Sequence, residues 1–286
     1  MGVRRRSLPA GWYPGTARGV RDAVQAMPGP TPPRRNAVAG VAPHAGWQFS
    51  GALASAVFAS LSGDLDTIVI IGGHLAPSDG ILCAFEEEYE TPLGNAPADL
   101  ELASLLSARM AVAEDRWADN TVEVQLPFAR HFFPASRLLG MRAPPSQAAG
   151  ELGRAIAEAA KASGKRVAVV GSTDLTHYGP NYGFDPAGSG AKAVNWVTGV
   201  NDRRFIDSLL AMDEAGARER GVGEHSACSA GGAIAAMAFA REAGATRGEL
   251  LDYRTSRDVY TPGRESPERL DESFVGYAAV VYRKEA

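Results

Sequence analysis

Short runs of apolar and β-branched residues alternate along this sequence with longer segments of helical pattern. The strand-like runs lie at residues 37–42, 67–71, 138–142, 167–171, 249–253 and 274–282. The helical segments between them are long enough to connect parallel strands, which tight hairpin turns cannot do. Strands joined in this way form sheets whose two faces are both buried under helices. The alternation therefore predicts an α/β fold with a mixed, largely parallel central sheet covered by helices on both faces.

The same pattern predicts further elements and a single domain. Helices are expected at 51–61, 98–110, 122–132, 146–163, 202–219 and 229–242, and an extended segment or hairpin at 80–89. Pro127 should interrupt the third helix, because proline lacks an N–H donor and clashes with the preceding turn, and Ser146 is the expected N-cap of the fourth. Residues 1–36 are rich in proline, glycine and arginine. We therefore expect an irregular N-terminal arm packed on one domain that spans residues 1–286.

Composition and charge exclude several classes of protein. A formal net charge of −4 over 286 residues gives no electrostatic basis for binding nucleic acid or an anionic membrane, and no apolar stretch reaches the roughly 18 residues of a membrane span. The basic residues 4–6 are not followed by an apolar segment, so no signal peptide is expected. With two cysteines, a disulfide framework is implausible and a reducing cytoplasm is the expected location. The glycines of 179–190 lack the flanking strand and helix of a dinucleotide fingerprint, so no nucleotide cofactor is expected.

Three of the five histidines follow strand-like runs. They are His44, His74 and His177, and they come from separate parts of the chain. In an open α/β sheet, the loops at the carboxyl ends of the strands converge on the crevice where ligands bind. The shared position of the three imidazoles therefore predicts a site that is assembled by folding.

The residues around His44 and His74 favour a role in that site. A proline fixes the approach to His44, and Gly46 lets the backbone come close behind it. Gly72 and Gly73 precede His74, and we expect them to admit a ligand near the main chain rather than to serve packing. The alternative for both histidines is a structural role in which the ring satisfies loop carbonyls.

Asp174 lies three residues before His177. A carboxylate near an imidazole can hold its tautomer and raise its basicity, as it does in general bases and metal ligands. The spacing therefore predicts that Asp174 orients His177. A local turn stabilised by the Asp174 side chain is the structural alternative.

The two cysteines have different surroundings. Cys228 lies where a helix is expected to begin, and a helix N-terminus favours the thiolate, which is both a nucleophile and a soft metal ligand. Cys83 lies in an apolar run and is expected in the core. His131, flanked by phenylalanines, is expected to be structural, and His225 either partners Cys228 or has no role in the site.

Two histidines and an anionic third ligand form an open site for metals that prefer imidazole. The anionic candidate here is Cys228 rather than a carboxylate, which favours copper, zinc or iron over magnesium. Glu123 is the leading carboxylate, as a ligand or as a group that orients one. Because these residues lie far apart in the sequence, their spacing does not choose between the alternatives.

Several motifs together resemble the Memo family (mediator of cell motility), called AmmeMemoRadiSam system protein B in many prokaryotes. The resemblance runs nearly end to end. Its motifs are Ala10-Gly-Trp-Tyr-Pro14, Pro43-His-Ala-Gly46 with Ser50-Gly51, Gly73-His74, Thr91-Pro-Leu-Gly94, Val122-Glu-Val-Gln-Leu-Pro-Phe128, Ser172-Thr-Asp-Leu-Thr-His-Tyr-Gly179 and Cys228.

This resemblance implies a fold and a set of site residues. Memo proteins are similar in fold to class III extradiol ring-cleavage dioxygenases, whose iron is held by two histidines and a carboxylate. The family pattern implies metal ligands at His44, His74 and Cys228. It also matches His177, with Asp174 beside it, to the catalytic histidine of the dioxygenases.

The chain departs from the family pattern at three places. Asn120 stands where the family usually has a histidine, Ser229 stands where a glycine is common, and the loop before His74 is shortened to Gly72-Gly73. All three metal candidates are retained, so the resemblance implies an intact site. The missing imidazole at Asn120 leaves the proton-transfer chemistry and the substrate open.

Three functional hypotheses follow. The leading one is a metal-binding redox protein with Fe(II) or copper, or alternatively zinc, that acts on a small molecule with O₂ and uses His177 as general acid and base. The second is a non-catalytic module that binds a peptide or another ligand in the same cleft, a role that the resemblance to animal Memo proteins implies for Trp12. The third is a thiol hydrolase with Cys228 as nucleophile, His177 as base and Asp174 as orienting group. The expected substrate-binding residues are Trp12, Glu123 and Tyr178.

Overall fold

A mixed sheet runs through the centre of the protein. The computed structural model describes residues 2–27, 35–258 and 272–284. Within them, nine strands form this sheet in the order β10-β12-β2-β9-β3-β8-β4-β7, with β11 alongside β12. Its middle consists of four parallel strands: β2 (Ala37–Ala42), β9 (Val167–Ser172), β3 (Thr67–Gly72) and β8 (Arg137–Arg142). The predicted runs match these four strands to within one residue at each end.

The margins of the sheet are antiparallel, which makes it mixed. On one side β12 runs antiparallel to β2 and also pairs with β10 and β11. On the other side β4 runs antiparallel to β8 and parallel to β7. The marginal strands are β4 (Ile81–Cys83), β7 (Val112–Glu114), β10 (His177–Tyr178), β11 (Ala245–Thr255) and β12 (Phe274–Lys284). A separate small sheet contains β1 (Val3–Arg4), β5 (Glu88–Tyr89) and β6 (Ala96–Pro97).

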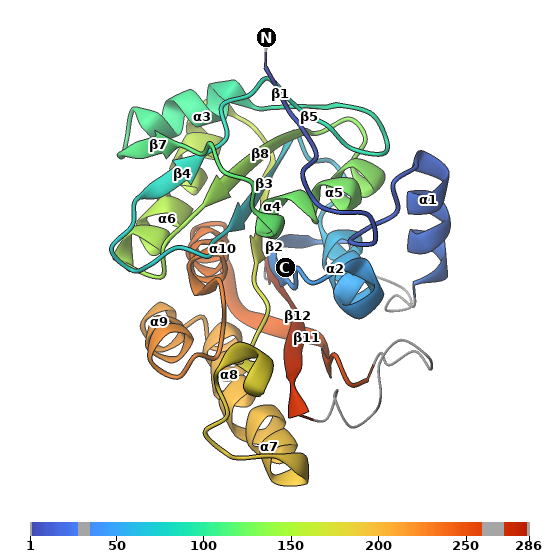
Figure 1. The fold of residues 1–286 in the computed structure, drawn as a ribbon. Helices are drawn as coiled ribbons and strands as arrows, with labels where there is room; N and C mark the ends of the chain where they lie inside the picture. Colours follow the sequence, from blue (N-terminus) through green and yellow to red (C-terminus); the bar gives the residue numbers. More distant parts are fainter. Residues whose placement is uncertain (1, 28–34, 259–271, 285–286) are drawn as a thin grey trace.

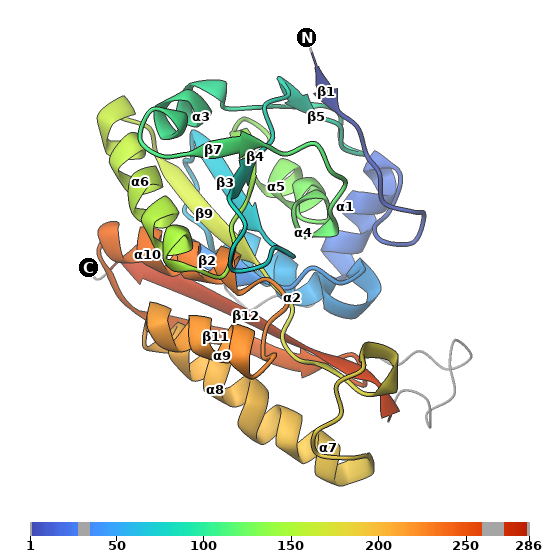
Figure 2. The same cartoon turned by 60° about the vertical axis from the view of Figure 1, so that its left-hand side comes forward.

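Helices cover both faces of the central sheet, as the alternation predicts (Figures 1 and 2). Because successive side chains of a strand point to opposite faces, β3 contributes Val69 and Ile71 to one core and Ile68 and Ile70 to another. The first core contains side chains of α3 (Leu100–Ser107), α6 (Gln147–Ser163), α8 (Asp202–Leu210), α9 (Glu214–Gly223) and α10 (Ala230–Glu242). The second contains side chains of α1 (Ala17–Ala26), α2 (Trp47–Ser60), α4 (Asn120–Glu123) and α5 (Leu126–Phe132).

The segment after β10 forms a small third core that the sequence pattern does not predict. It contains a 3₁₀ turn at Pro180–Tyr182, helix α7 (Gly190–Trp196) and a π-helical turn at Val197–Asn201. Tyr178 is buried among apolar side chains of this segment. The glycine-rich loop expected at 179–190 therefore leads directly into a helix.

The composition of the N-terminal arm predicts an irregular segment throughout. The arm instead contains a regular element, helix α1. Thr16 caps this helix by accepting a hydrogen bond from the backbone N–H of Gly19. Val20 and Val24, one turn apart, are buried. A capped helix with an apolar stripe is stable enough to fold against the body. Residues 28–34 of the expected arm lie outside the described residues.

Two other expectations about helices were wrong in detail. Pro127 does not interrupt a helix, because it lies in the first turn of α5, where a missing N–H costs nothing; the break comes earlier, between α4 and α5. The helix expected at 202–219 is divided into α8 and α9. At that break Met212 has a positive φ of 54°, and the Asp213 carboxylate caps α9 by accepting from the N–H of Gly216.

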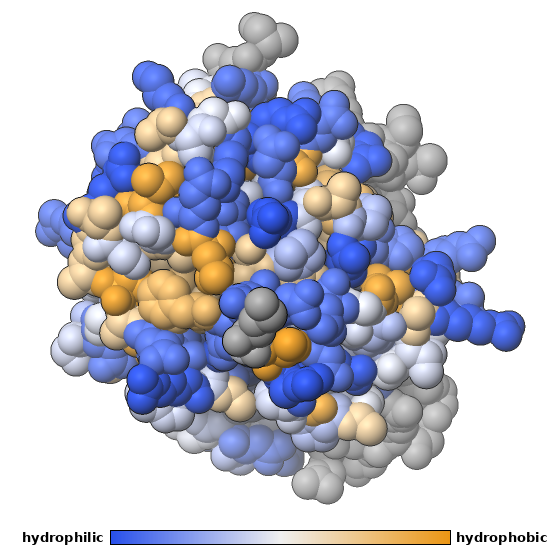
Figure 3. Space-filling model, turned by 90° about the horizontal axis from the view of Figure 1, so that it is seen from above, coloured by the Kyte–Doolittle hydropathy of each residue, from blue (hydrophilic) through white to orange (hydrophobic). Residues whose placement is uncertain are grey.

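The face that carries the N-terminus is largely hydrophilic, with an apolar area to one side (Figure 3). Two arginines near the N-terminus form ion pairs: Arg4 of β1 pairs with Glu86, and the exposed Arg5, which follows β1, pairs with Glu90. Among the described residues, no helix combines the length and the apolar character that crossing a bilayer requires.

Glu123, at the end of α4, holds the N-terminal arm to the body. Its Oε1 accepts hydrogen bonds from the Leu8 N–H at 3.0 Å and the Tyr13 hydroxyl at 2.7 Å. Its Oε2 accepts from the N–H and the hydroxyl of Ser7, at 2.9 and 2.5 Å. Because the carboxylate is 8% exposed, these arm donors replace water around a buried charge. Glu123 therefore anchors the N-terminal arm to α4.

Replacing Glu123 with alanine should lower the free energy of unfolding by about 2 kcal/mol, because the variant removes the acceptor of the buried Tyr13 hydroxyl and of the partly buried Ser7 and Leu8 donors. Urea unfolding followed by circular dichroism measures the change. Glu151→Ala, at an exposed position of α6, is the control and should unfold close to the wild type. An unchanged unfolding midpoint for Glu123→Ala would contradict the role of Glu123.

Candidate metal centre

The carboxyl ends of the parallel strands bring three candidate residues to one edge of the sheet. His44 lies two residues beyond β2, His74 two beyond β3 and Asp174 two beyond β9. Cys228 reaches the same edge from the other direction, two residues before α10 begins. The structure therefore brings His44 and His74 to this edge, whereas His177 is the first residue of β10 rather than part of the turn that directly follows β9.

His44, His74 and Cys228 form a compact cluster. One ligand atom of each lies within 4.8 Å of the others. The Cys228 Sγ lies 3.2 Å from His44 Nε2. The two imidazole rings meet edge to face, with centroids 5.1 Å apart and planes at 87°. The three residues that the sequence singles out as metal candidates thus lie together, although binding of a metal stays a prediction.

His44 is the buried member of the cluster. Its Nδ1 lies 3.3 Å from the Ser172 hydroxyl, which also accepts a hydrogen bond from Gln125 Nε2 at 3.1 Å. This contact turns Nε2 toward Cys228. Burial and the neighbouring His74 lower the pKa of His44 to about 3. The ring is therefore neutral near pH 7, the form that binds a metal.

His74 is the accessible member, with a side chain that is 38% exposed. Its backbone lies in the left-handed region, with φ of 56°, which is uncommon for a residue with a Cβ. Its Nδ1 lies 3.2 Å from Asp119 Oδ2. Burial would raise the pKa of Asp119, but hydrogen bonds from His74 and Thr121 hold it at about 2. Asp119 is therefore ionised beside His74.

Gly72 and Gly73 do serve packing, contrary to the expectation from the sequence. A Cβ at Gly72 would collide with the Thr121 side chain, and one at Gly73 would collide with Ser229. The hydroxyl of Ser229 is buried and has no hydrogen-bond partner among the described residues. The two glycines are thus required by the close approach of α4 and the start of α10.

Cys228 is a protonated thiol rather than the thiolate expected at a helix N-terminus. Burial, together with the nearby Asp174 carboxylate, raises the pKa of Cys228. The Sγ donates toward the Asp174 carbonyl oxygen at 3.7 Å. The imidazole that contacts its Sγ is that of His44. This arrangement differs from the Cys228–His177–Asp174 order of the hydrolase hypothesis.

Asp174 supports His44 rather than orienting His177 directly. Its Oδ1 accepts the backbone N–H of His44 at 2.6 Å. The His177 Nδ1 instead lies 3.2 Å from the Leu175 carbonyl oxygen. Burial lowers the pKa of His177, and the charge of Asp174 opposes this shift. Burial in turn raises the pKa of Asp174, against the hydrogen bonds from the His44 loop. Asp174 and His177 are thus coupled by charge.

The three expected substrate-binding residues lie in different surroundings. Trp12 contacts the segment that follows His44. Its carbonyl oxygen accepts a hydrogen bond from the backbone N–H of Trp47 at 2.7 Å, and its main chain lies against Gly46. Tyr178 is 1% exposed, and its hydroxyl donates to the Gly188 carbonyl inside the third core. Glu123 is bonded to the arm and does not join the ligand cluster. The contact of Trp12 with the segment that follows His44 is therefore made through its main chain.

Sequence reasoning missed several polar residues around the cluster. Ser172 and Arg142 are the last residues of β9 and β8, so the strand-end argument would have found them had it not been limited to histidine. Asp119 adjoins Asn120, the position where the family usually has a histidine. Asn120 donates from Nδ2 to the His44 carbonyl at 3.3 Å, so its side chain supports the ligand loop. Cys83 is buried in the first core, as expected.

A mixed α/β sheet with two imidazoles and a thiol gathered at its strand ends defines an α/β protein with a candidate metal centre. The model of the family described as "Memo-like protein" matches residues 4–281. This chain therefore belongs to the Memo-like family.

Curated relatives carry the same family name. A MEMO1 family protein from Thermococcus onnurineus is 34% identical over 266 residues, which cover 87% of this chain and 88% of the relative. A second, from Thermococcus kodakarensis, is 35% identical over 267 residues, with coverage of 87% and 88%. The crystal structure of an uncharacterized Escherichia coli K12 protein superposes with a TM-score of 0.48 at 14% identity, over 80% of this chain and 90% of that one.

The low pKa of His44 predicts how the stability of the metal-free protein depends on pH. An unfolded histidine takes up a proton near pH 6.5, whereas folded His44 does not until about pH 3. The folded state therefore loses stability as the pH falls below 6.5. Between pH 7 and pH 5, the wild type should lose about 2 kcal/mol more than His44→Gln.

Urea unfolding at the two pH values, with chelator present, measures this difference. His225→Gln, at an exposed histidine outside the cluster, is the control and should follow the wild-type pH dependence. Parallel pH profiles for the wild type and His44→Gln would refute the assignment of a neutral His44.

Proposed function

We propose that this Memo-like protein binds iron(II) or copper, with zinc as the alternative, on His44, His74 and Cys228, and acts as an oxidoreductase on a small molecule with O₂. The observation that carries the proposal is the cluster itself: side chains from three separate segments bring their ligand atoms within 4.8 Å of one another. Two imidazoles and one sulfur suit copper, zinc and iron, whereas magnesium prefers oxygen ligands.

The protonation states of the cluster fit a metal ion. His44 is neutral near pH 7, so no proton has to leave its ring. Burial and the Asp174 carboxylate act against the Cys228 thiolate, and the imidazole in contact with its sulfur belongs to the neutral His44. A bound cation would supply the positive charge that favours the thiolate. The half-exposed His74 keeps one side of the cluster accessible to a small molecule.

His177 is the residue we propose to move protons in this site. Its Nδ1 is beside the Leu175 carbonyl oxygen, which can only accept, so Nδ1 carries the hydrogen and Nε2 is left as the acceptor. Burial keeps the ring neutral, and the charge of Asp174 favours the protonated ring that forms when His177 takes a proton. The redox chemistry itself would be supplied by bound iron(II) or copper.

Elemental analysis of protein purified without an affinity tag tests the metal site. The wild type should contain one metal ion per chain, and His44→Ala, His74→Ala and Cys228→Ser should each lose most of it. His131→Ala, at a histidine on α5 outside the cluster, is the matched control and should retain it. Equal metal content in all five proteins would show that the cluster does not bind the metal.

A further inference from the structure

Asp119 is the hydrogen-bond partner of His74, the accessible histidine of the cluster. It is the N-cap of α4, where its Oδ1 accepts hydrogen bonds from the N–H of Thr121 at 2.9 Å and from the Thr121 hydroxyl. Its Oδ2 is directed to the Nδ1 of His74 at 3.2 Å. Within the described residues, this is the one hydrogen bond of the His74 ring. The carboxylate is 8% exposed, so its position is set by the protein and not by water.

Arg142 contacts the same carboxylate oxygen of Asp119 as His74 does. It lies at the carboxyl end of β8 and is paired with Gly72 of β3. The strand that ends in Arg142 and the strand that precedes His74 therefore end side by side. Arg142 Nη1 lies 3.5 Å from Asp119 Oδ2. Arg142 also forms a two-point pair with the Asp115 carboxylate, at 2.7 and 2.9 Å. Arg142 therefore links Asp119 to Asp115 through charge-assisted hydrogen bonds.

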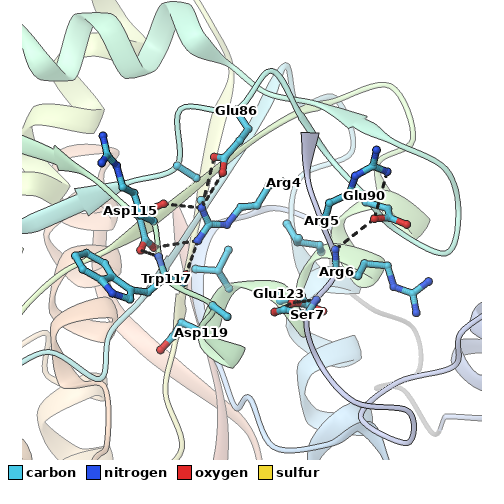
Figure 4. Close-up of a pocket in the computed structure, with 16 residues that line it drawn as sticks. Arg4, Arg5, Arg6, Ser7, Glu86, Glu90, Asp115, Trp117, Asp119 and Glu123 are labelled. Atoms are coloured by element: carbon cyan, nitrogen blue, oxygen red, sulfur yellow. Dashed lines mark hydrogen bonds and ion pairs between the residues drawn. The ribbon is translucent and has the colours of Figure 1, made fainter. Parts of the chain in front are cut away.

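The segment 115–119 is also fixed from the side of the N-terminal arm. Arg4 donates to the carbonyl oxygens of Asp115 and Trp117, each at 2.7 Å. A cavity of about 200 Å³ lies between the arm and this segment, and Asp119 and Glu123 are both on its wall (Figure 4). The loop that carries Asp119 is therefore held between β8 and β1.

From this geometry we propose that Asp119 is a positioning residue that sets the tautomer of His74. The Nδ1–H of His74 donates to Asp119 Oδ2, so the lone pair of Nε2 is left free for a metal. This inference rests on the proposed metal site and adds the residue that prepares His74 for it. Without Asp119, a half-exposed ring on a left-handed residue would lose its hydrogen bond and its fixed orientation. Carboxylates that accept from the second nitrogen of a histidine act in this way at metal sites.

The tautomer of His74 can be measured without any metal. In ¹⁵N-edited spectra of metal-free protein, with the signal assigned through His74→Gln, the wild type should show a protonated Nδ1 and an unprotonated Nε2. Asp119→Ala should shift His74 toward the form with the proton on Nε2. Asp119→Asn should retain the wild-type tautomer, because the Arg142 guanidinium favours placing the single amide oxygen on the side of His74 Nδ1. Its amide nitrogen then faces Thr121 and gives up the cap of α4. A wild-type His74 signal in Asp119→Ala would overturn the proposal.

The effect on binding is measured with zinc alone, in competition with a chromogenic chelator. Asp119→Ala should weaken the affinity for zinc by about 10- to 100-fold, and Asp119→Asn by less. Glu114→Gln removes an exposed carboxylate at the end of β7, one residue before this segment, where it pairs with Arg116, and should leave the affinity unchanged. Equal zinc affinity in Asp119→Ala and the wild type would contradict the role of Asp119. If the wild type itself bound no zinc, iron or copper, the proposed function would fail, and the tautomer spectra would still decide the role of Asp119.

Discussion

The parallel register of β2, β9, β3 and β8 is the constraint on which the site depends. Ala42 is paired with Ser172, Ile71 with Gly171, and Gly72 with Arg142. Since these strands end level with one another, the residues just beyond them become neighbours although they lie far apart in the chain. Backbone hydrogen bonds between four buried strands thus bring the site residues together, whereas a short sequence motif does so in many small metal-binding domains.

Much of this arrangement could be predicted from the sequence, because it depends on local pattern. The four parallel strands are continuous apolar runs with sharp polar ends, and the helices α6 and α10 have clear starts. The strand-end position of His44 and His74 was enough to predict that they converge. Cys228 required a second argument, since it approaches the edge from a helix rather than from a strand.

What the sequence did not reveal are contacts that exist only after folding. Glu123 lies in a motif that resembles the family, yet its oxygens bind the arm, more than a hundred residues earlier in the chain. The glycines before His74 suggest space for a ligand, but the space is filled by Thr121 and Ser229. Cys228 lies two residues before α10, and burial beside Asp174 outweighs any effect of the helix N-terminus on its pKa. In each case a long-range neighbour, which no local pattern encodes, decides what the residue does.

Helix α4 is one turn long, and it has a different task at each end. Asp119, its N-cap, faces His74, while Glu123, its last residue, receives the hydrogen bonds of the arm. The N-terminal segment is thereby attached to the same rigid turn that faces the ligand cluster. An affinity tag or fusion partner that displaces this segment would disturb the candidate metal centre through α4, so a fusion at the other end of the chain is the better design for studying the His44–His74–Cys228 cluster.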